Sequence, residues 1–104
     1  MVVTGLGALT PIGLDVESYF IGLIEGKNGI SRVDAFDTEK FTCKIGGQIR
    51  DFDPAAVMDP KEARRNDRFV QFAFAAAKQA VEQSGLDFEK EDPERIGVFV
   101  GSGI

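Results

Sequence analysis

Phe69-Val-Gln-Phe-Ala-Phe-Ala-Ala-Ala77 forms the middle of the longest helix that the sequence predicts. Apolar residues of this stretch lie on nearly every side of such a helix. A helix that is apolar all round is covered all round by other structure. The chain offers one short sheet, which covers one side only. We therefore expect an α/β protein in which this helix is buried on both sides and sequence beyond these 104 residues supplies a second layer.

The flanks of this stretch carry residues that favour the start and the end of a helix. Asp59 is suited to cap the helix, Pro60 suits the first helical position and Glu62 suits the third. We expect the helix to run from here to Ser84-Gly85, and Asn66-Asp67 is the point where it can break.

Downstream of the helix, Ile96-Gly-Val-Phe-Val-Gly-Ser-Gly-Ile104 predicts a buried strand that runs into a Gly-Ser-Gly turn. In α/β proteins a helix usually follows such a turn, and the chemistry of the site gathers at the carboxyl ends of the strands. We therefore expect the chain to be the front part of a larger protein, with most of its site outside these residues.

Upstream, Val2-Val3-Thr4 predicts a short strand, followed by a glycine-rich turn that ends at Gly13. A helix is expected to begin at Asp15, which can cap it, and to end at Gly26. Gly5-x-Gly7 after a strand invites a dinucleotide-binding interpretation, but Thr10 stands where that motif needs a third small residue. A tight turn that brings backbone close to neighbouring backbone is the favoured reading.

Between residues 41 and 50 the apolar residues alternate with polar ones, which predicts a half-buried strand with a bulge at Gly46-Gly47. Cys43 falls on the inward phase, where a small apolar residue is expected. The chain has no histidine to activate its thiol, so we interpret Cys43 as a packing residue and not as a nucleophile.

The composition excludes several classes of function. The chain is 43% hydrophobic, which is typical of a globular protein, and its net charge of -5 disfavours binding to nucleic acid or to an anionic membrane surface. One cysteine and no histidine leave no usual zinc site and no internal nucleophile–imidazole pair. No apolar run approaches the ~20 residues of a membrane span, and no signal peptide is visible. The single cysteine is compatible with a reducing cytosol, so we expect a cytoplasmic protein. We also expect no cofactor and no metal.

Four cations stand out as candidates for binding a partner. Lys61, Arg64, Arg65 and Arg68 lie at i, i+3, i+4 and i+7, which places them along one face of a continuous helix. In an acidic chain such a local basic cluster can steer an acidic partner. From the residues alone, an ordinary solvated helix face is the favoured alternative.

Several segments taken together closely resemble the β-ketoacyl-acyl carrier protein synthases, the condensing enzymes of fatty-acid synthesis. The similarity runs in order along the whole chain, which makes it far more specific than any single motif. The segments that carry it are 2–13, 26–31, 36–38, 51–53, 61–67, 95–97 and 101–104.

The resemblance implies a thiolase-like fold, layered α/β/α/β/α in the full protein, with a mixed sheet and a central buried helix. Residues 1–104 would form an incomplete N-terminal domain of it. It implies a decarboxylating Claisen condensation in which a cysteine carries the acyl chain, two histidines assist decarboxylation and an oxyanion hole stabilises the tetrahedral charge. The family cysteine and histidines lie further along, and Cys43 does not match that cysteine. The chain is therefore expected to contain no catalytic residue and to be inactive alone.

Two site assignments follow from the resemblance, residue by residue. The equivalents of Lys61, Arg64 and Arg65 dock the acidic helix of acyl carrier protein, and Ile104 aligns with the residue that gates the acyl pocket in the type II enzyme. Ile104 and the segment Phe36-Asp37-Thr38 favour type II. The implied partners are acyl carrier protein with its acyl and malonyl thioesters, and a second copy in a homodimer.

The leading interpretation is a type II fatty-acid synthase of this family, and two other readings stay open. A polyketide ketosynthase, or the chain-length partner that lacks the nucleophile and acts as a binding subunit, is the second interpretation, and these residues do not exclude it because the discriminating cysteine lies downstream. A nucleotide-binding oxidoreductase domain is disfavoured by Thr10.

Overall fold

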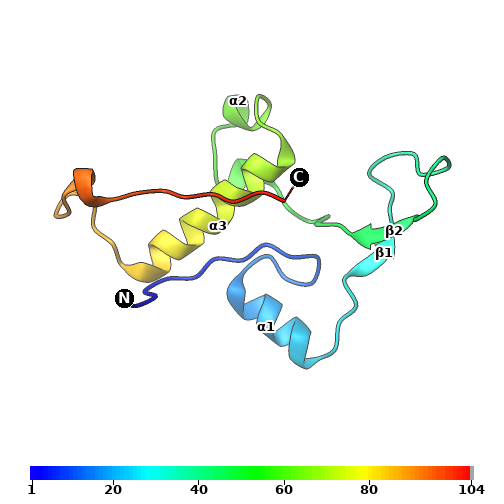
Figure 1. Ribbon diagram of the computed structural model, residues 1–104, viewed down its shortest axis with the longest axis horizontal. Coiled ribbons are helices and arrows are strands. Elements are labelled where there is room, and N and C mark those ends of the chain that lie inside the picture. Colours follow the sequence, from blue (N-terminus) through cyan, green and yellow to red (C-terminus); the bar gives the residue numbers. More distant parts are fainter. Residues whose placement is uncertain (104) are drawn as a thin grey trace.

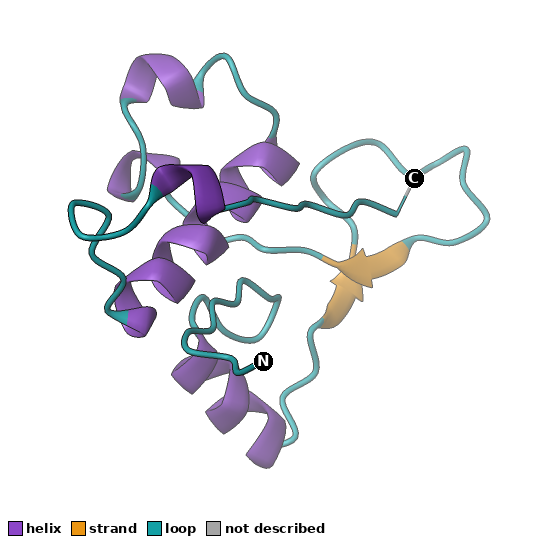
Figure 2. Cartoon of the chain, turned by 60° about the vertical axis from the view of Figure 1, so that its left-hand side comes forward, coloured by secondary structure: helices purple, strands orange, loops and turns teal. Residues whose placement is uncertain are grey.

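The computed structural model describes residues 1–103. Three helices and one small hairpin are spread over an elongated shape, with the hairpin apart from the helices (Figures 1 and 2). Ile104, the expected acyl-pocket residue, lies outside the described residues. In chain order the elements are α1 (Val16–Ile24), β1 (Ile30–Arg32), β2 (Ile45–Gly47), the 3-10 turn η1 (Pro54–Ala56), α2 (Pro60–Ala63), α3 (Arg68–Ser84) and the 3-10 turn η2 (Pro93–Arg95).

The long helix forms where the sequence predicts it, and it breaks where the sequence allows a break. α2 ends at Ala63 and α3 begins at Arg68, so the Asn66-Asp67 interruption is confirmed. α3 ends at Ser84 and is capped by Gly85, whose φ of 67° lies in the left-handed region that a residue without Cβ adopts readily.

Within the described residues, α3 is covered on one side only. Ala75 is 2% exposed, whereas Phe69 is 65% exposed and Phe74 is also largely exposed. The expectation of a central buried helix is therefore not met by residues 1–103, because the layer needed on the second side is not among them. The radius of gyration of 16.3 Å also exceeds the roughly 13 Å of a compact domain of this length.

The glycine-rich N-terminal segment packs tightly along α3. A Cβ built on Gly5 would overlap the carbonyl oxygen of Ala80, and one on Gly7 would overlap that of Ala76. This confirms close approach of backbone to backbone at the Gly5-x-Gly7 turn. The expected strand at residues 2–4 is not formed, because no described segment pairs with its backbone.

The first helix is capped as the sequence predicts. The carboxylate of Asp15 accepts from the backbone N–H of Ser18 at 2.8 Å, and the Ser18 hydroxyl accepts from the Asp15 N–H at 3.3 Å. This reciprocal pair is a capping box. The helix ends before Gly26, whose φ is 66°.

The strand predicted over residues 41–50 is much shorter than expected. β2 pairs antiparallel with β1, with Ile30 opposite Gly47, Ser31 opposite Gly46 and Arg32 opposite Ile45. This register is regular, so the predicted bulge is wrong. Cys43 is exposed, so the predicted inward packing is also wrong. The alternation of apolar and polar residues over 41–50 is typical of a sheet with one covered face. No segment of residues 1–103 covers that face.

Residues 96–103 are extended but form no strand. Phe99 is 97% exposed, and Val98 and Val100 are also exposed. The expected buried strand is thus unpaired and uncovered by the described residues, and the sheet they do form is two-stranded and antiparallel instead of mixed.

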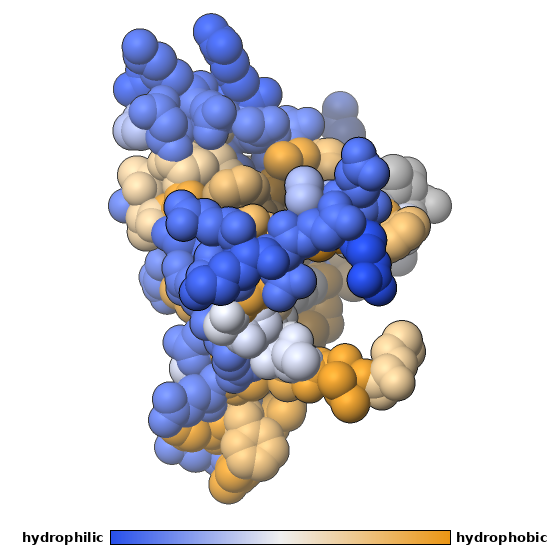
Figure 3. Space-filling model, turned by 90° about the vertical axis from the view of Figure 1, so that its left-hand side faces the viewer, coloured by the Kyte–Doolittle hydropathy of each residue, from blue (hydrophilic) through white to orange (hydrophobic). Residues whose placement is uncertain are grey.

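Other apolar side chains are also exposed to solvent, among them Phe20 and Ile24 of α1. Figure 3 shows apolar surface gathered over the lower part of one face, where α1 lies. Exposed apolar side chains gathered on one face are typical of a surface that contacts further protein.

Candidate functional site

The short helix α2 and the turn after it present three cations to solvent. Asp59 caps α2, because its carboxylate accepts from the backbone N–H of Lys61 at 2.8 Å, and Pro60 occupies the first helical position. Lys61, Arg64 and Arg65, which we call the basic patch, are all exposed. None of the three makes an ion pair with any residue in the described range 1–103.

Arg68 does not belong to this patch, contrary to the helical spacing in the sequence. The break before α3 interrupts the face that would have joined it to Lys61. Its Nη2 donates to the backbone carbonyl of Ile49 at 2.7 Å, and its guanidinium lies 5.0 Å from the centre of the Phe72 ring. Its side chain therefore ties α3 to the segment after β2.

A buried glutamine supports the basic patch from below. Gln71 on α3 is 7% exposed, and its Nε2 donates to the carbonyl oxygens of Ala63 at 2.8 Å and Asn66 at 3.0 Å. The side chain of Asn66 in turn donates to the carbonyl of Glu62 at 2.9 Å. Sequence reasoning missed Gln71, although a lone amide between Val70 and Phe72 in an otherwise apolar stretch was the available signal.

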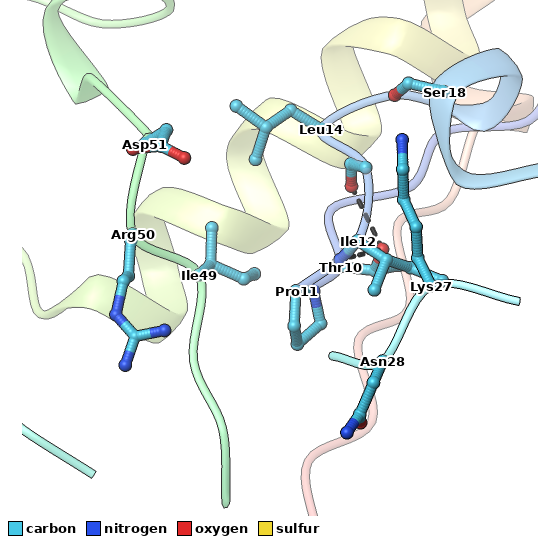
Figure 4. Close-up of a pocket in the computed structure, with 11 residues that line it drawn as sticks. Thr10, Pro11, Ile12, Leu14, Ser18, Lys27, Asn28, Ile49, Arg50 and Asp51 are labelled. Carbon is cyan, nitrogen blue, oxygen red and sulfur yellow. Dashed lines mark hydrogen bonds between the residues drawn. The ribbon is translucent and has the colours of Figure 1, made fainter. Parts of the chain in front are cut away.

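An open cavity of about 520 Å³ lies between the N-terminal turn and the segment after β2 (Figure 4). Thr10, Pro11 and Lys27 stand on one side and Ile49 and Arg50 on the other. Both cations of the cavity are already compensated, because Lys27 pairs with Glu25 at 3.1 Å and Arg50 with Asp34 at 3.2 Å. The hydroxyls that line the cavity, those of Thr10 and Ser18, are engaged with the backbone of Gly13 and Asp15.

The one cysteine of the chain has no histidine beside it to act as a base. Cys43 is exposed on the hairpin, where its Sγ lies 3.4 Å from the carbonyl oxygen of Ile45, and the chain has no histidine. Residues 1–103 contain no group of three or more acidic, cysteine or histidine side chains placed to hold a metal ion. In the same range, no helix is both long and apolar enough to cross a membrane.

The glycine turn does not form a nucleotide site. Gly5 and Gly7 lie in close contact with the backbone of α3, which leaves no space there for a ligand. α1 begins only after a further turn, in which Thr10 and Gly13 form a β-bridge. No helix N-terminus follows the glycines directly, as binding of a pyrophosphate would require.

Comparison with known proteins assigns the chain to a family. The family described as "Beta-ketoacyl synthase, N-terminal domain" matches residues 1–104. Over all 104 residues the chain is 45% identical to 3-oxoacyl-[acyl-carrier-protein] synthase 2 of Synechocystis sp. and 44% identical to the protein of that name from Coxiella burnetii. Each alignment covers 100% of this chain and 25% of the relative, so the chain spans a quarter of these proteins.

Two solved structures share its fold. The ishigamide ketosynthase/chain length factor superposes with a TM-score of 0.75 and 35% identity, over 85% of this chain and 22% of the other. A type II polyketide ketosynthase in complex with its acyl-carrier protein gives a TM-score of 0.68 and 29% identity, over 90% and 23%. From the match along its whole length, the chain belongs to the β-ketoacyl synthase family, within the N-terminal domain.

Proposed function

We propose that this chain is part of a type II 3-oxoacyl-acyl carrier protein synthase and that it contributes the surface on which the carrier protein docks. The observation that carries the proposal is 45% identity over all 104 residues to a protein of that name. The exposed, unpaired basic patch on α2 and the turn after it supports the docking role.

The proposed reaction extends an acyl chain held as a thioester. Malonyl-carrier protein loses CO2, its C2 carbanion attacks the acyl carbonyl, the bond to the enzyme sulfur breaks, and 3-oxoacyl-carrier protein and the free thiolate result. The resemblance assigns a cysteine and two histidines to these steps. Cys43 is exposed on the hairpin and the chain has no histidine, so we assign no catalytic step to these 104 residues.

Docking is proposed to work through charge. Lys61, Arg64 and Arg65 face solvent without ion-pair partners in residues 1–103, so they are free to meet an acidic helix. Exposed charges at the rim of an interface mainly set the association rate and its sensitivity to salt. One of the similar structures is described as a ketosynthase bound to its acyl-carrier protein.

The docking role is tested by reversing charges in the full-length protein. Arg64→Glu with Arg65→Glu should raise KM for the carrier-bound substrate and leave the reaction with a carrier-free thioester nearly unchanged. Lys40→Glu with Lys44→Glu on the β1–β2 loop is the matched control, because it changes net charge equally at a distant exposed site. Equal losses with both kinds of substrate would mean that the arginines act on the fold.

The proposal extends to Ile104 as a residue of the acyl pocket. It rests on the resemblance alone, because Ile104 is outside the described residues. Ile104→Phe should lower kcat/KM for long acyl primers more than for short ones, since overpacking a fitted pocket costs roughly 1–3 kcal/mol. An equal fall for both lengths would contradict the gating role.

A polyketide ketosynthase or its chain-length partner is the second candidate, favoured by the likeness to a ketosynthase/chain length factor. Incubating the full-length protein with acyl- and malonyl-carrier protein distinguishes the fatty-acid enzyme, the polyketide ketosynthase and the chain-length partner. One condensation per primer supports the fatty-acid enzyme, repeated condensations without reduction support a polyketide ketosynthase, and activity only with a second subunit supports the chain-length partner. Sedimentation of the same sample tests the homodimer that we propose.

A further inference from the structure

The basic patch spans a very short helix and the turn after it, because Lys61 lies in α2, Arg64 is its C-cap and Arg65 follows. α2 has four residues, and a helix of one turn is far from stable in water on its own. The Glu62 carbonyl near its C-terminal end is bonded from beyond the helix, by the Arg65 N–H at 3.0 Å and the Asn66 side chain at 2.9 Å. The orientation of Lys61, Arg64 and Arg65 must therefore be held by contacts from outside α2.

Gln71 supplies such a contact. Its Nε2 carries two hydrogens, and both are used, one on the carbonyl of Ala63 at 2.8 Å and one on the carbonyl of Asn66 at 3.0 Å. These two carbonyls lie on either side of Arg64 and Arg65. Because Gln71 is 7% exposed, water competes poorly for these bonds. One rigid side chain of α3 thus fixes both ends of the turn that carries the two arginines.

We propose that Gln71 is a positioning residue for carrier docking: it holds the turn between α2 and α3 so that the basic patch is pre-formed before the carrier protein arrives. This inference rests on the docking role proposed above. A pre-formed surface avoids the cost of ordering side chains and turn on binding, and that cost would otherwise be subtracted from the affinity.

The test uses Gln71→Met in the full-length protein, because methionine matches the length of glutamine but donates no hydrogen bond. KM for the carrier-bound substrate should rise about threefold to tenfold, the effect of losing one or two hydrogen bonds. Both kcat and the constants for a carrier-free thioester should stay unchanged. Hydrogen exchange should speed up at the Ala63, Arg64 and Arg65 amides, which bond to Asp59, Pro60 and Glu62.

Gln79→Met is the matched control on the same helix. Gln79 also makes two hydrogen bonds, accepting from the Ala8 N–H at 3.0 Å and donating to the Leu14 carbonyl at 2.7 Å, but it does not touch α2. It should lower the melting temperature without changing KM for the carrier-bound substrate. If Gln71→Met does not fold, Gln71→Asn keeps the amide but shortens its reach to the two carbonyls, and it should also raise that KM. An unchanged KM for Gln71→Asn would then overturn the positioning role.

The outcomes separate this inference from the docking role. If the double arginine reversal raises KM for the carrier-bound substrate but Gln71→Met does not, the positioning role is wrong and docking stands. If Gln71→Met and Gln79→Met raise it equally, the effect is general loss of stability and the inference is overturned. If the arginine reversal has no effect, docking itself is wrong and the inference falls with it.

Discussion

Two segments of the chain have nearly the same residue pattern and very different surroundings. Residues 2–7 read Val-Val-Thr-Gly-Leu-Gly, and residues 98–103 read Val-Phe-Val-Gly-Ser-Gly. The glycines of the first segment lie against the backbone of α3, and its Leu6 N–H donates to the side chain of Gln83. Around Gly101 and Gly103, a Cβ would meet no described atom within 4 Å.

This difference separates two reasons for a Gly-x-Gly sequence after an apolar run. In the first segment a side chain would collide with a helix, so glycine is required by packing that exists within residues 1–103. In the second segment the described residues impose no such requirement. Any need for glycine there must come from contacts outside them, as the expected site at the end of the strand would provide.

The largest expected effect on stability concerns the second segment, residues 98–103, which is exposed. Phe99 is 97% exposed in residues 1–103, so Phe99→Ala should change the unfolding free energy of the 104-residue chain by less than about 0.5 kcal/mol. In the full-length protein, where we expect a buried strand, it should cost about 3–5 kcal/mol. Urea unfolding of both proteins measures the contrast. Small changes in both would mean that the segment stays exposed in the full-length protein.

The next largest effect on stability concerns the first segment, residues 2–7, which is packed against α3. Gly7→Ala places a Cβ against the backbone of Ala76, which cannot move without bending α3, and should cost the 104-residue chain about 1–3 kcal/mol. Gly101→Ala is the matched control and should be within about 0.5 kcal/mol of wild type. The midpoint of urea unfolding reports both. If the two substitutions behave alike, the two segments do not differ in packing.

Gln79→Met should loosen the packed segment without a collision. It removes the bond from the Ala8 N–H and the bond to the Leu14 carbonyl, worth about 1–2 kcal/mol together. Amide exchange at Ala8 should accelerate most. Unchanged protection at Ala8 would show that the glycine contacts alone hold the segment to α3.

The same contrast explains which elements could be predicted from the sequence. Helix limits were predicted well, because caps act over a few residues: Asp15 with Ser18, Asp59 with Lys61, and Gly85 at the end of α3. Strands at residues 2–4, 41–50 and 96–100 were predicted but are absent or short here. A strand needs a partner for its backbone, and local sequence does not say where that partner lies.

The candidate site was predictable in its residue types but not in its grouping. Lys61, Arg64 and Arg65 are exposed together as expected. Arg68 does not lie with them, because the helix is broken before it and its side chain bonds to the carbonyl of Ile49. The support from Gln71 was not predictable from spacing, because the carbonyls that it binds lie beyond that break.

The smallest expected effect concerns the cap of α1, into which the packed N-terminal segment runs. The Ser18 N–H, the Ser18 hydroxyl and the Glu17 N–H lower the pKa of Asp15 below its ordinary 3.8, against a small opposing effect of burial. A lowered pKa in the folded state means that the stabilisation is fully present above about pH 3.8 and is lost as the pH falls through the folded pKa.

At pH 7, Asp15→Ala should therefore destabilise the 104-residue chain by about 1 kcal/mol, as loss of an N-cap typically does. Asp15→Asn keeps the cap without the titrating group, so it should lose only a few tenths of a kcal/mol and should lack the acid-dependent part. Urea unfolding at pH 7 and below pH 3.8 tests both variants against wild type. If the difference between wild type and Asp15→Asn is the same at both pH values, the bond from Ser18 does not depend on the charge of Asp15. The lowered pKa would then make no contribution to stability, and the cap would act through its hydrogen bonds alone.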